Sequence, residues 1–345
     1  MTQPRNERPT LAEVADAAGV SRATVSKVLN GRHDVSAGTR SRVEQLLSEH
    51  AYVRRVAPRT EDASSPTAGG GLDLVVDTLL SPYTLEVIRG VSEAADEVGL
   101  EVVLTQGGEN GSGRWVDRVA GAGRHGVILV TSALSAQQRR ALGAAAVPLV
   151  LIDPLVVPDD VPSVGATNWA GGLAATEHLI GLGHRRIGVL GGPSGVTNAV
   201  ARVHGYRAAL ENAGLPVDTD LIRYGDFGAA TARASTAALL RGRRPPSAIF
   251  ATSDPQAFGA LVAARDCGVA VPSELSVVGF DGMPITEWAA PPLTTIQTPM
   301  TDMGRMAVRL LGRLAEGSEL ESIRIELSTR LVVRESTAPP RAAGD

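Results

Sequence analysis

The sequence predicts a small all-α head joined to a larger α/β body that holds two doubly wound parallel-sheet subdomains. Three observations lead to this fold class. Two short helical patterns separated by a glycine open the chain, a stretch rich in Pro, Ser, Thr and Gly follows at 58–71, and short apolar runs then alternate with amphipathic stretches. Strands that are apolar on both faces and alternate with helices indicate parallel sheets with right-handed crossovers.

The head is expected to contain two short helices at a wide angle, followed by a third. Residues 10–13 (TLAE) form a capping box that begins the first helix, and Gly19 ends it. Ser21 caps the second helix, and the third begins after Ser36. A helix-turn-helix of this kind can insert its second helix into the major groove of DNA. The exposed face of that helix carries Arg22, Ala23, Ser26 and Lys27.

The body is expected to alternate strands and helices through two similar halves. The predicted strands are LDLVVD (72–77), LEVVLTQ (100–106), GVILVTS (126–132), PLVLIDP (148–154), RRIGVLGG (185–192), SAIFATSD (247–254) and LSVVGFD (275–281). The predicted helices lie near 84–98, 112–121, 135–145, 169–182, 197–213, 229–241 and 255–267. Doubly wound sheets bind ligands beyond the carboxyl ends of their strands, so the residues just after each strand are candidate site residues.

Composition and charge narrow the function. No apolar run approaches the roughly 18 residues of a membrane span, and the N-terminal MTQPRNERPT lacks the apolar region of a secretion signal. The lone Cys267 cannot form an internal disulfide, which fits a cytoplasmic protein. Residues 1–60 hold 10 Lys and Arg against 6 Asp and Glu, a net charge of +4, whereas the remainder holds 23 against 31, a net charge of −8. A basic head on an acidic body is typical of a nucleic-acid-binding module attached to another domain.

Several enzyme motifs fail in their context. GAGRHG (121–126) has the spacing of a dinucleotide-binding loop, but it precedes a strand instead of following one. The chain has no phosphate-binding P-loop sequence and no G-x-S-x-G nucleophile elbow. The six histidines show no metal-ligand spacing. We therefore predict no catalytic residues, no cofactor and no metal.

Residues 10–53 (TLAEVADAAGVSRATVSKVLNGRHDVSAGTRSRVEQLLSEHAYV) resemble the DNA-binding head of the lac/galactose repressor (LacI/GalR) family. Five body segments resemble that family's effector domain in order and spacing, namely GATNWAGGLAATEHLIGLGHRRIGVLGGP, ARVHGYRAALENAG, SAIFATSDPQAFGAL, VPSELSVVGFD and PPLTTI. The resemblance covers about residues 10–335. It implies a bacterial transcriptional regulator whose body has the fold of periplasmic sugar-binding proteins, with an effector in the cleft between two subdomains.

The resemblance also sets the domain boundaries and the expected partners. It implies a head (1–53), a hinge and linker (54–71), an effector-binding and dimerisation domain (72–335) and a disordered tail (336–345). The N-subdomain is expected at about 72–166 and 298–325, and the C-subdomain at about 167–297 and 326–335. The tail STAPPRAAGD lacks the family's tetramerising leucine repeat, so we expect a homodimer on double-stranded operator DNA, with amphipathic segments 84–98, 255–267 and 298–315 in its interface.

The motif match assigns DNA contacts residue by residue. Arg22 and Ala23 correspond to base-reading positions, and Lys27 flanks them. Many family members insert a leucine from a hinge helix into the minor groove, but Pro58 would break such a helix here. The alternatives are a basic arm that orders on DNA and a solvated linker, and we favour the arm. The expected DNA-contacting residues are Thr10, Ser21, Arg22, Ala23, Thr24, Ser26, Lys27, Asn30, Ser36, Thr39, Arg54 and Arg55.

The expected effector is a monosaccharide or oligosaccharide, with a xylose- or glucose-based sugar as the guess. Arg202 and Asp281 match the arginine and the carboxylate that the family points into its cleft, where they would clamp sugar hydroxyls. The alternative is a structural ion pair between the two. Phe227 and Trp169 either stack on the sugar or fill the core, and Asp254 either contacts it or caps a helix. The full expected set is Tyr83, Asp153, Asn168, Trp169, Asn198, Arg202, Phe227, Ser253, Asp254 and Asp281.

Three functions are compatible with at least part of the sequence. A ligand-responsive repressor fits the whole chain. A sugar-transport binding protein shares the body fold, but it needs an export signal and no DNA-binding head. An enzyme on a doubly wound fold needs a phosphate or dinucleotide loop. The sequence therefore favours a repressor that a sugar releases from its operator, with corepression as the alternative response.

Overall fold

The computed structural model describes residues 70–107, 114–121, 124–131 and 134–341, and in the head residues 15, 17–21, 24, 25, 28, 36, 38, 39, 41–43 and 46. The chain divides into two compact units, residues 1–66 and 67–345. Each unit is considered by itself below.

The described part of the head has a small apolar core. The backbone of Gly19 is left-handed, with φ of 66°, and the Ser21 hydroxyl accepts a hydrogen bond of 3.1 Å from the backbone N–H of Thr24. These features are the turn and the N-cap that the sequence predicts between its first two helices. The core consists of Ala15, Ala18, Val25, Val28 and Val43, with Val20 and Leu46 packed against it.

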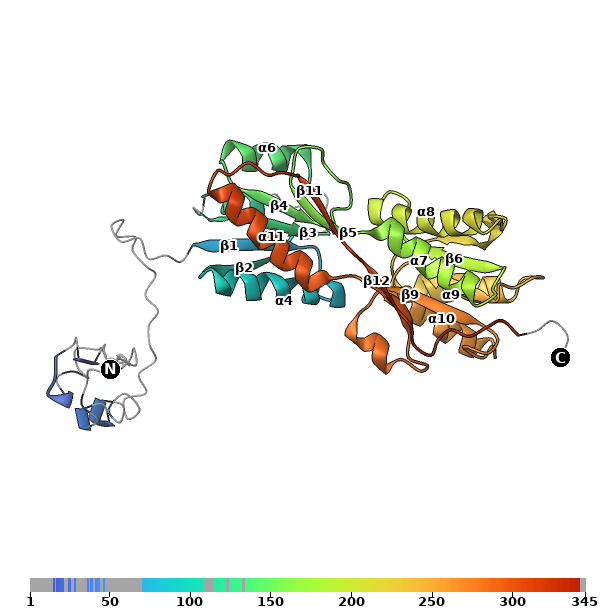
Figure 1. Ribbon diagram of the computed structural model, residues 1–345. Coiled ribbons are helices and arrows are strands. Elements are labelled where there is room, and N and C mark those ends of the chain that lie inside the picture. The colour runs from blue at the N-terminus through green and yellow to red at the C-terminus, as the bar shows by residue number, and fades with distance from the viewer. Residues whose placement is uncertain are drawn as a thin grey trace, which may run out of the picture. The chain divides into compact units, whose positions relative to one another are not determined.

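Two six-stranded sheets form the second unit, and each defines a lobe (Figure 1). The N-lobe sheet has the order β11-β5-β4-β3-β1-β2, and all of its neighbouring strands are parallel. Its strands are β1 (Gly71–Val76), β2 (Glu101–Gln106), β3 (Gly126–Val130), β4 (Leu149–Ile152), β5 (Ser163–Ala166) and β11 (Arg324–Leu327).

The C-lobe sheet has the order β12-β10-β9-β8-β6-β7 and is parallel except for its edge strand β12. Its strands are β6 (Ile187–Gly191), β7 (Ile222–Tyr224), β8 (Ala248–Ala251), β9 (Ser276–Asp281), β10 (Thr294–Gln297) and β12 (Arg330–Val332). The two doubly wound sheets confirm the predicted fold class. The strands β5, β7, β10, β11 and β12 were not among the predicted ones, because each is short and its apolar residues are interrupted by polar residues or glycine.

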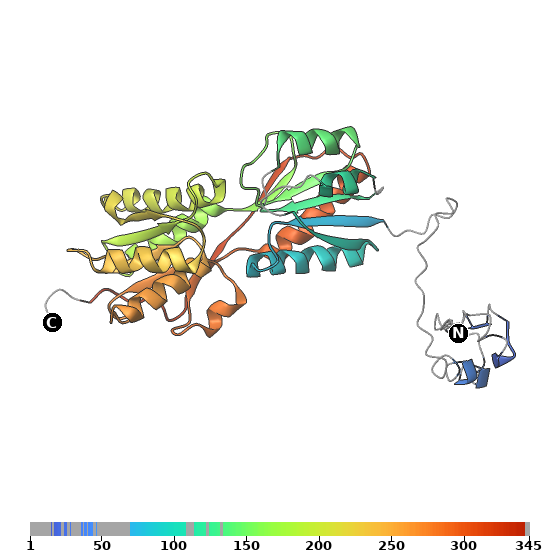
Figure 2. The same ribbon diagram turned by 180° about the vertical axis from the view of Figure 1, so that it is seen from behind.

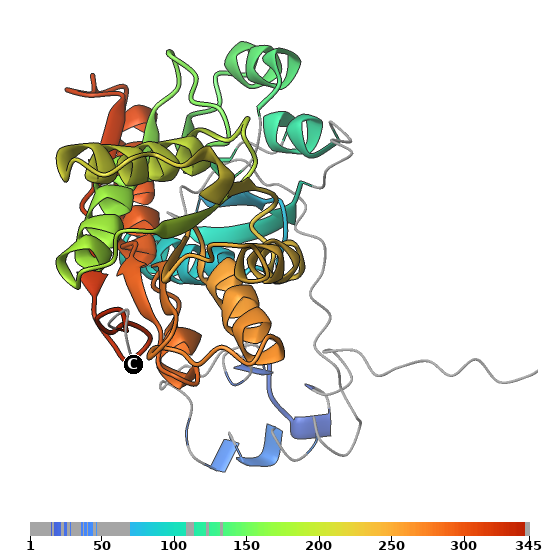
Figure 3. The same ribbon diagram turned by 90° about the vertical axis from the view of Figure 1, so that its right-hand side faces the viewer.

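Helices cover both faces of each sheet, as Figures 2 and 3 show from two further directions. In the N lobe, α4 (Pro82–Glu97) and α11 (Met300–Ala315) pack on one face, and α5 (Arg114–Gly121) and α6 (Ala136–Ala144) on the other. In the C lobe, one face carries α7 (Asn168–Gly181) and α8 (Thr197–Asn212), and the other carries α9 (Ala229–Leu240) and α10 (Asp254–Asp266). Two 3₁₀ turns, η1 (Thr219–Leu221) and η2 (Pro284–Trp288), complete the C lobe.

The chain passes between the lobes three times. It crosses from β5 to α7, from β10 to α11 and from β11 to β12, and Figure 1 shows the last crossing as the link between two successive strands, one in each lobe. The predicted subdomain boundary places that last crossing between residues 325 and 326. It comes two residues later, because Glu326 and Leu327 still pair with Gly165 and Ala166 of β5.

The predicted disordered tail is wrong for residues 336–341. Ser336 is completely buried, and its hydroxyl accepts a hydrogen bond from Thr294 N–H and donates one to the Val277 carbonyl. The Ala338 carbonyl accepts a hydrogen bond of 2.9 Å from a ring nitrogen of the buried His184. Composition suggested disorder, but these polar groups complete the backbone bonding at the edge of the C lobe. Residues 342–345 lie outside the described part of the chain.

Close packing of α4 against α11 depends on glycine, which generates a stability prediction. A Cβ on Gly304 would lie 2.7 Å from the Val87 carbonyl oxygen and 2.8 Å from the Val91 nitrogen, whereas a Cβ on Gly312 would meet nothing within 4 Å. We expect Gly304→Ala to lower the free energy of unfolding by about 1–3 kcal/mol, since neither backbone can yield. Gly312→Ala, on the same helix, should raise it by about 0.5–1 kcal/mol. Urea unfolding followed by circular dichroism measures both, and equal effects would contradict the packing argument.

Candidate functional site

The candidate site lies where strand ends of the two lobes face each other. Asp153 directly follows β4 of the N lobe, and Asp281 ends β9 of the C lobe. Both residues have positive φ, 42° for Asp153 and 108° for Asp281. A non-glycine residue that adopts a positive φ is strained by about 1–3 kcal/mol, and such strain is concentrated at functional sites.

Arg202 is the centre of the site. It lies on α8, is 4% exposed, and donates from Nε to Asn168 Oδ1 at 2.7 Å. Its Nη1 donates to Asp281 Oδ1 at 3.0 Å and to the Thr252 carbonyl at 2.6 Å. The guanidinium also lies 3.7 Å from the centre of the Phe280 ring. The structure therefore pairs Arg202 with Asp281, which was the alternative to a free hydroxyl clamp.

Asp153 brings the N lobe into the same cluster. The Tyr83 hydroxyl donates a hydrogen bond to Asp153 Oδ2, whereas Oδ1 is buried and has no hydrogen bond of ordinary geometry among the described residues. Burial raises the pKa of Asp153, and the Tyr83 hydrogen bond, the Arg202 charge and the Asn198 side chain oppose that shift. Asp153 thus faces polar groups of both lobes and keeps an acceptor oxygen for a ligand.

The cleft is also bridged by the backbone. Both the N–H and the hydroxyl of Thr197, at the start of α8, donate to the Leu155 carbonyl, at 3.1 and 3.2 Å. Leu155 follows β4, so this contact joins the two lobes beside Asp153 and Asn198. Sequence reasoning missed Leu155, Thr197 and Thr252, because their contribution is made largely by backbone atoms, for which no side-chain pattern exists. Phe280 could have been found as the aromatic residue beside Asp281.

Two expected effector residues instead have structural partners. Asp254 is completely buried, and its two carboxylate oxygens accept hydrogen bonds from Met283 N–H at 2.8 Å and Thr295 Oγ1 at 2.6 Å. This corrects the expectation that Asp254 contacts the effector. Ser253, not Asp254, caps α10, because its hydroxyl accepts from the Gln256 N–H, and the same hydroxyl donates to the Phe227 carbonyl.

The two aromatic candidates differ in exposure. Trp169 stands in the first turn of α7 and is 48% exposed. The Phe227 ring packs over Gly192, where an added Cβ would lie only 2.5 Å from the ring. Either ring can offer an apolar face to a sugar.

Four expected DNA contacts lie among the described residues of the head. The hydroxyls of Ser21 and Thr24 lie 2.9 Å apart, and those of Ser36 and Thr39 lie 2.8 Å apart. Each pair stands at the start of a helix, so the serines serve as caps. The other expected contacts lie outside the described residues, namely Thr10, Arg22, Ala23, Ser26, Lys27, Asn30, Arg54 and Arg55.

Among the described residues, no group of three or more His, Cys, Asp or Glu side chains could hold a metal ion. The same part of the chain has no helix that is long and apolar enough to span a bilayer.

Comparison with known proteins assigns the family. Residues 10–55 match the family model of bacterial regulatory proteins of the lacI family, and residues 176–337 match that of a periplasmic binding protein-like domain. The chain is 37% identical to the HTH-type transcriptional regulator CelR of Thermobifida fusca over 96% of its own length and 99% of that protein's. The chain belongs to the LacI family.

Solved structures agree with this LacI-family assignment. The transcriptional regulator CelR–cellobiose complex has a TM-score of 0.72 at 36% identity and covers 95% of this chain and 100% of its own. The lac repressor dimer bound to operator and the anti-inducer ONPF also has a TM-score of 0.72, at 27% identity, and covers 96% and 100%. The LacI-family protein is therefore a DNA-binding transcriptional regulator with a periplasmic-binding-protein-like body, and not an enzyme.

The buried carboxylates of this LacI-family regulator generate a pH prediction. Burial, together with the nearby Asp281 carboxylate, raises the pKa of Asp254 from 3.8 to about 8. Burial also raises the pKa of Asp281 to about 6, although Arg202 opposes that shift. Between pH 3.8 and about 8 the unfolded chain loses the Asp254 proton before the folded chain does, so stability should fall as the pH rises.

The measurement is the urea midpoint of unfolding of wild type and Asp254→Asn at intervals from acid to mildly alkaline pH. The amide cannot ionise, so we expect the variant to lose less stability than wild type over that window. Asp266→Asn, which removes a half-exposed carboxylate from an ion pair with Arg233, serves as a matched control and should follow wild type. Parallel curves for wild type and Asp254→Asn would contradict the assignment.

Proposed function

We propose that the protein is a transcriptional repressor that binds a pseudo-palindromic operator as a homodimer and is released by a sugar bound in the cleft around Arg202. The observation that carries this proposal is the buried cluster of Arg202, Asp281, Asn168 and Asp153, which joins strand and helix ends of both lobes. We also place the protein in the bacterial cytoplasm, where its operator would be.

A sugar fits the chemistry of this cluster. Guanidinium and carboxylate groups bind neighbouring hydroxyls in pairs, and the acceptor oxygen Asp153 Oδ1 is left for a hydroxyl donor. The Phe227 and Trp169 rings supply apolar surface for the C–H face of a pyranose. The relative whose solved structure carries cellobiose supports a glucose-based monosaccharide or oligosaccharide. The cluster holds one guanidinium and two carboxyl groups, and this lack of a cationic excess does not favour a phosphorylated ligand.

Release from DNA follows from linkage between the two sites. A dimer binds tightly only when its two heads match the half-site spacing of the operator. A sugar that replaces the Leu155–Thr197 contact between the lobes with its own hydroxyls would favour a different lobe arrangement and so a different head spacing. The sugar can weaken DNA binding only by as much as it prefers that arrangement.

The head is proposed to contact DNA in two ways. Arg22 and Ala23 read base edges in the major groove, with Lys27 beside them. The hydroxyls of the two helix starts and the remaining expected residues contact phosphates, and Arg54 and Arg55 form a basic arm along the minor groove. In support, the two described caps, Ser21 and Ser36, stand at helix N-termini, where phosphates are favoured.

We expect sugar-dependent release to require Asp153. Full-length protein would be titrated by fluorescence anisotropy onto DNA from upstream of its own gene, with and without cellobiose, glucose, xylose and xylobiose. Asp153→Asn should leave DNA affinity without sugar unchanged within twofold and raise the half-releasing sugar concentration at least tenfold, since the amide replaces a hydrogen-bond acceptor. Asp160→Asn, an exposed carboxylate paired with Arg139, is the matched control.

Outcomes separate the parts of the proposal. Saturable DNA binding that no sugar changes would support the proposed operator binding and contradict the proposed sugar effector. Tighter DNA binding in the presence of a sugar would replace induction by corepression. If the folded protein shows no sequence-specific DNA binding at low salt, the proposal that it is a repressor is wrong.

The proposed homodimer has a separate test. Leu80 and Trp288 are 93% and 82% exposed, which is unusual for side chains of this size, and the solved relative bound to operator is a dimer. We expect the full chain to sediment as a dimer at micromolar concentration and Trp288→Glu to shift it at least tenfold toward monomer. Tyr224→Glu, at a 51% exposed aromatic on the edge strand β7, is the control. A Trp288→Glu variant that dimerises like wild type would remove this surface from the interface.

A further inference from the structure

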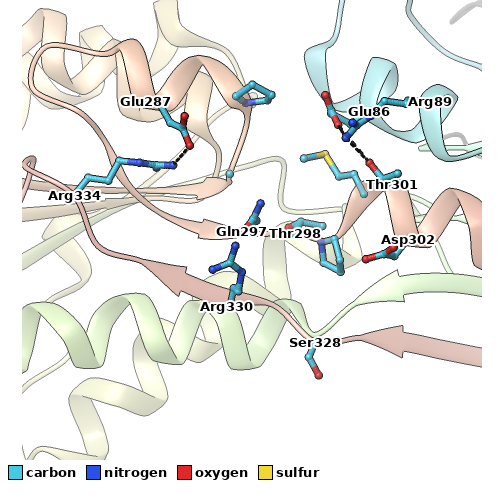
Figure 4. Close-up of a pocket in the computed structure, with 14 residues that line it drawn as sticks. Glu86, Arg89, Glu287, Gln297, Thr298, Thr301, Asp302, Ser328, Arg330 and Arg334 are labelled. Atoms are coloured by element: carbon cyan, nitrogen blue, oxygen red, sulfur yellow. Dashed lines mark hydrogen bonds and ion pairs between the residues drawn. The ribbon is translucent and has the colours of Figure 1, made fainter.

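A second hollow, of about 460 Å³, lies at the junction of the lobes and is lined by none of the ten residues expected to bind the effector (Figure 4). Its walls come from α4 and α11 of the N lobe and from η2 and β12 of the C lobe. Two of the three lobe crossings run along it, at Gln297–Met300 and at Ser328–Arg330. A ligand here would therefore touch both lobes and the connections between them.

On both walls of the hollow, an arginine is already paired with a glutamate. On the N-lobe side, Arg89 pairs with Glu86 and donates to Thr301 Oγ1 at 2.8 Å. On the C-lobe side, Arg334 pairs with Glu287 at 3.0 Å and also donates to the Leu293 carbonyl. Neither arginine is a free anion receptor, because each is neutralised by its glutamate.

The space between these walls holds polar groups that lack partners. Within the part of the chain that the structure describes, the side chains of Arg330 and Asp302 make no ion pair or hydrogen bond. Thr298 is 2% exposed, and its hydroxyl has no hydrogen-bond partner there, nor has the buried Oε1 atom of Gln297. Figure 4 shows the Arg330 side chain extending from β12 toward Gln297, between the two paired walls. Arg330 and Asp302 are exposed to solvent, whereas the Thr298 and Gln297 atoms are buried. Buried polar atoms are nearly always satisfied in folded proteins, so these two orphaned atoms point to a missing ligand.

The charges of the hollow restrict that ligand. Three arginines and three carboxylates line it, without Lys or His, so its formal charge is zero. A dianion such as a phosphate monoester would meet one free guanidinium and the unpaired Asp302. A single carboxylate matches the Arg330 fork in a bidentate pair, and hydroxyls match Thr298, Gln297 and Asp302. The volume suits a small, hydrophilic molecule.

We propose that this hollow is a second ligand site, which takes a polyhydroxylated monocarboxylate, such as a sugar acid, on Arg330, Thr298 and Gln297. The carboxylate pairs with Arg330, and the hydroxyls satisfy the orphaned atoms of the two neighbouring residues. Because the site spans both lobes, its ligand stabilises one lobe arrangement and so modulates the regulator independently of the cleft.

The test is isothermal titration calorimetry of full-length protein with D-gluconate, without DNA, so that it does not depend on the proposed repressor function. We expect saturable gluconate binding and no comparable binding of D-glucose 6-phosphate. Arg330→Gln should weaken gluconate binding at least tenfold. Thr298→Val, which keeps the side-chain shape and removes the hydroxyl, should weaken it severalfold. The matched control is Arg324→Gln on β11, because Arg324 is exposed, pairs with Glu326 and does not line the hollow.

Three results would overturn the proposal. One is the absence of saturable gluconate binding by folded wild-type protein. A second is gluconate binding that Arg330→Gln and Thr298→Val leave unchanged, with circular dichroism confirming that both variants are folded. The third is binding that Arg202→Gln abolishes while the two hollow variants retain it, since gluconate would then occupy the cleft.

Discussion

The desolvated guanidinium of Arg202 is the interaction on which the arrangement of the cleft depends. A buried charge without compensation costs several kcal/mol, so the groups that surround it must stay in place. Asn168, Thr252 and Asp281 come from three separate segments of the C lobe, and each is held by its contact with the same side chain. Removing the guanidinium would leave Asp281 buried and unpaired, at a cost of about 3–5 kcal/mol.

The Arg202 cluster also explains how events in the cleft can reach the rest of the molecule. Asp153 lies in its field and belongs to the N lobe, and the Leu155 carbonyl ties that lobe to α8 two residues further on. In addition to these noncovalent contacts, the chain itself connects the lobes at three crossings. A ligand that rearranges this small set of contacts acts on the lobe orientation directly, because few other interactions have to break.

Most of the fold could be predicted from the sequence, since long amphipathic helices and fully apolar strands have strong local patterns. The helix expected near 197–213 and the strand expected at 275–281 match α8 and β9 within two residues. Short strands such as β11 and β12 have no such pattern, because their burial is mixed and pairing with strands distant in the sequence creates them. The prediction of a disordered C-terminal segment was wrong for a similar reason. Its composition suggests disorder, but hydrogen bonds to His184 and Ser276, which are distant in the sequence, hold it in place.

The sequence by itself determined the fold class, the LacI-family resemblance and the residue types gathered at the strand ends, because apolar periodicity and motif spacing are local properties of the chain. Only the tertiary structure decided which of those residues meet. It paired Arg202 with Asp281, turned Asp254 toward Met283 and Thr295, and left the buried Thr298 hydroxyl without a partner among the described residues at the lobe junction. Partner choice depends on distances between distant segments and on the cost of burying each charge, and neither quantity is written in a linear pattern.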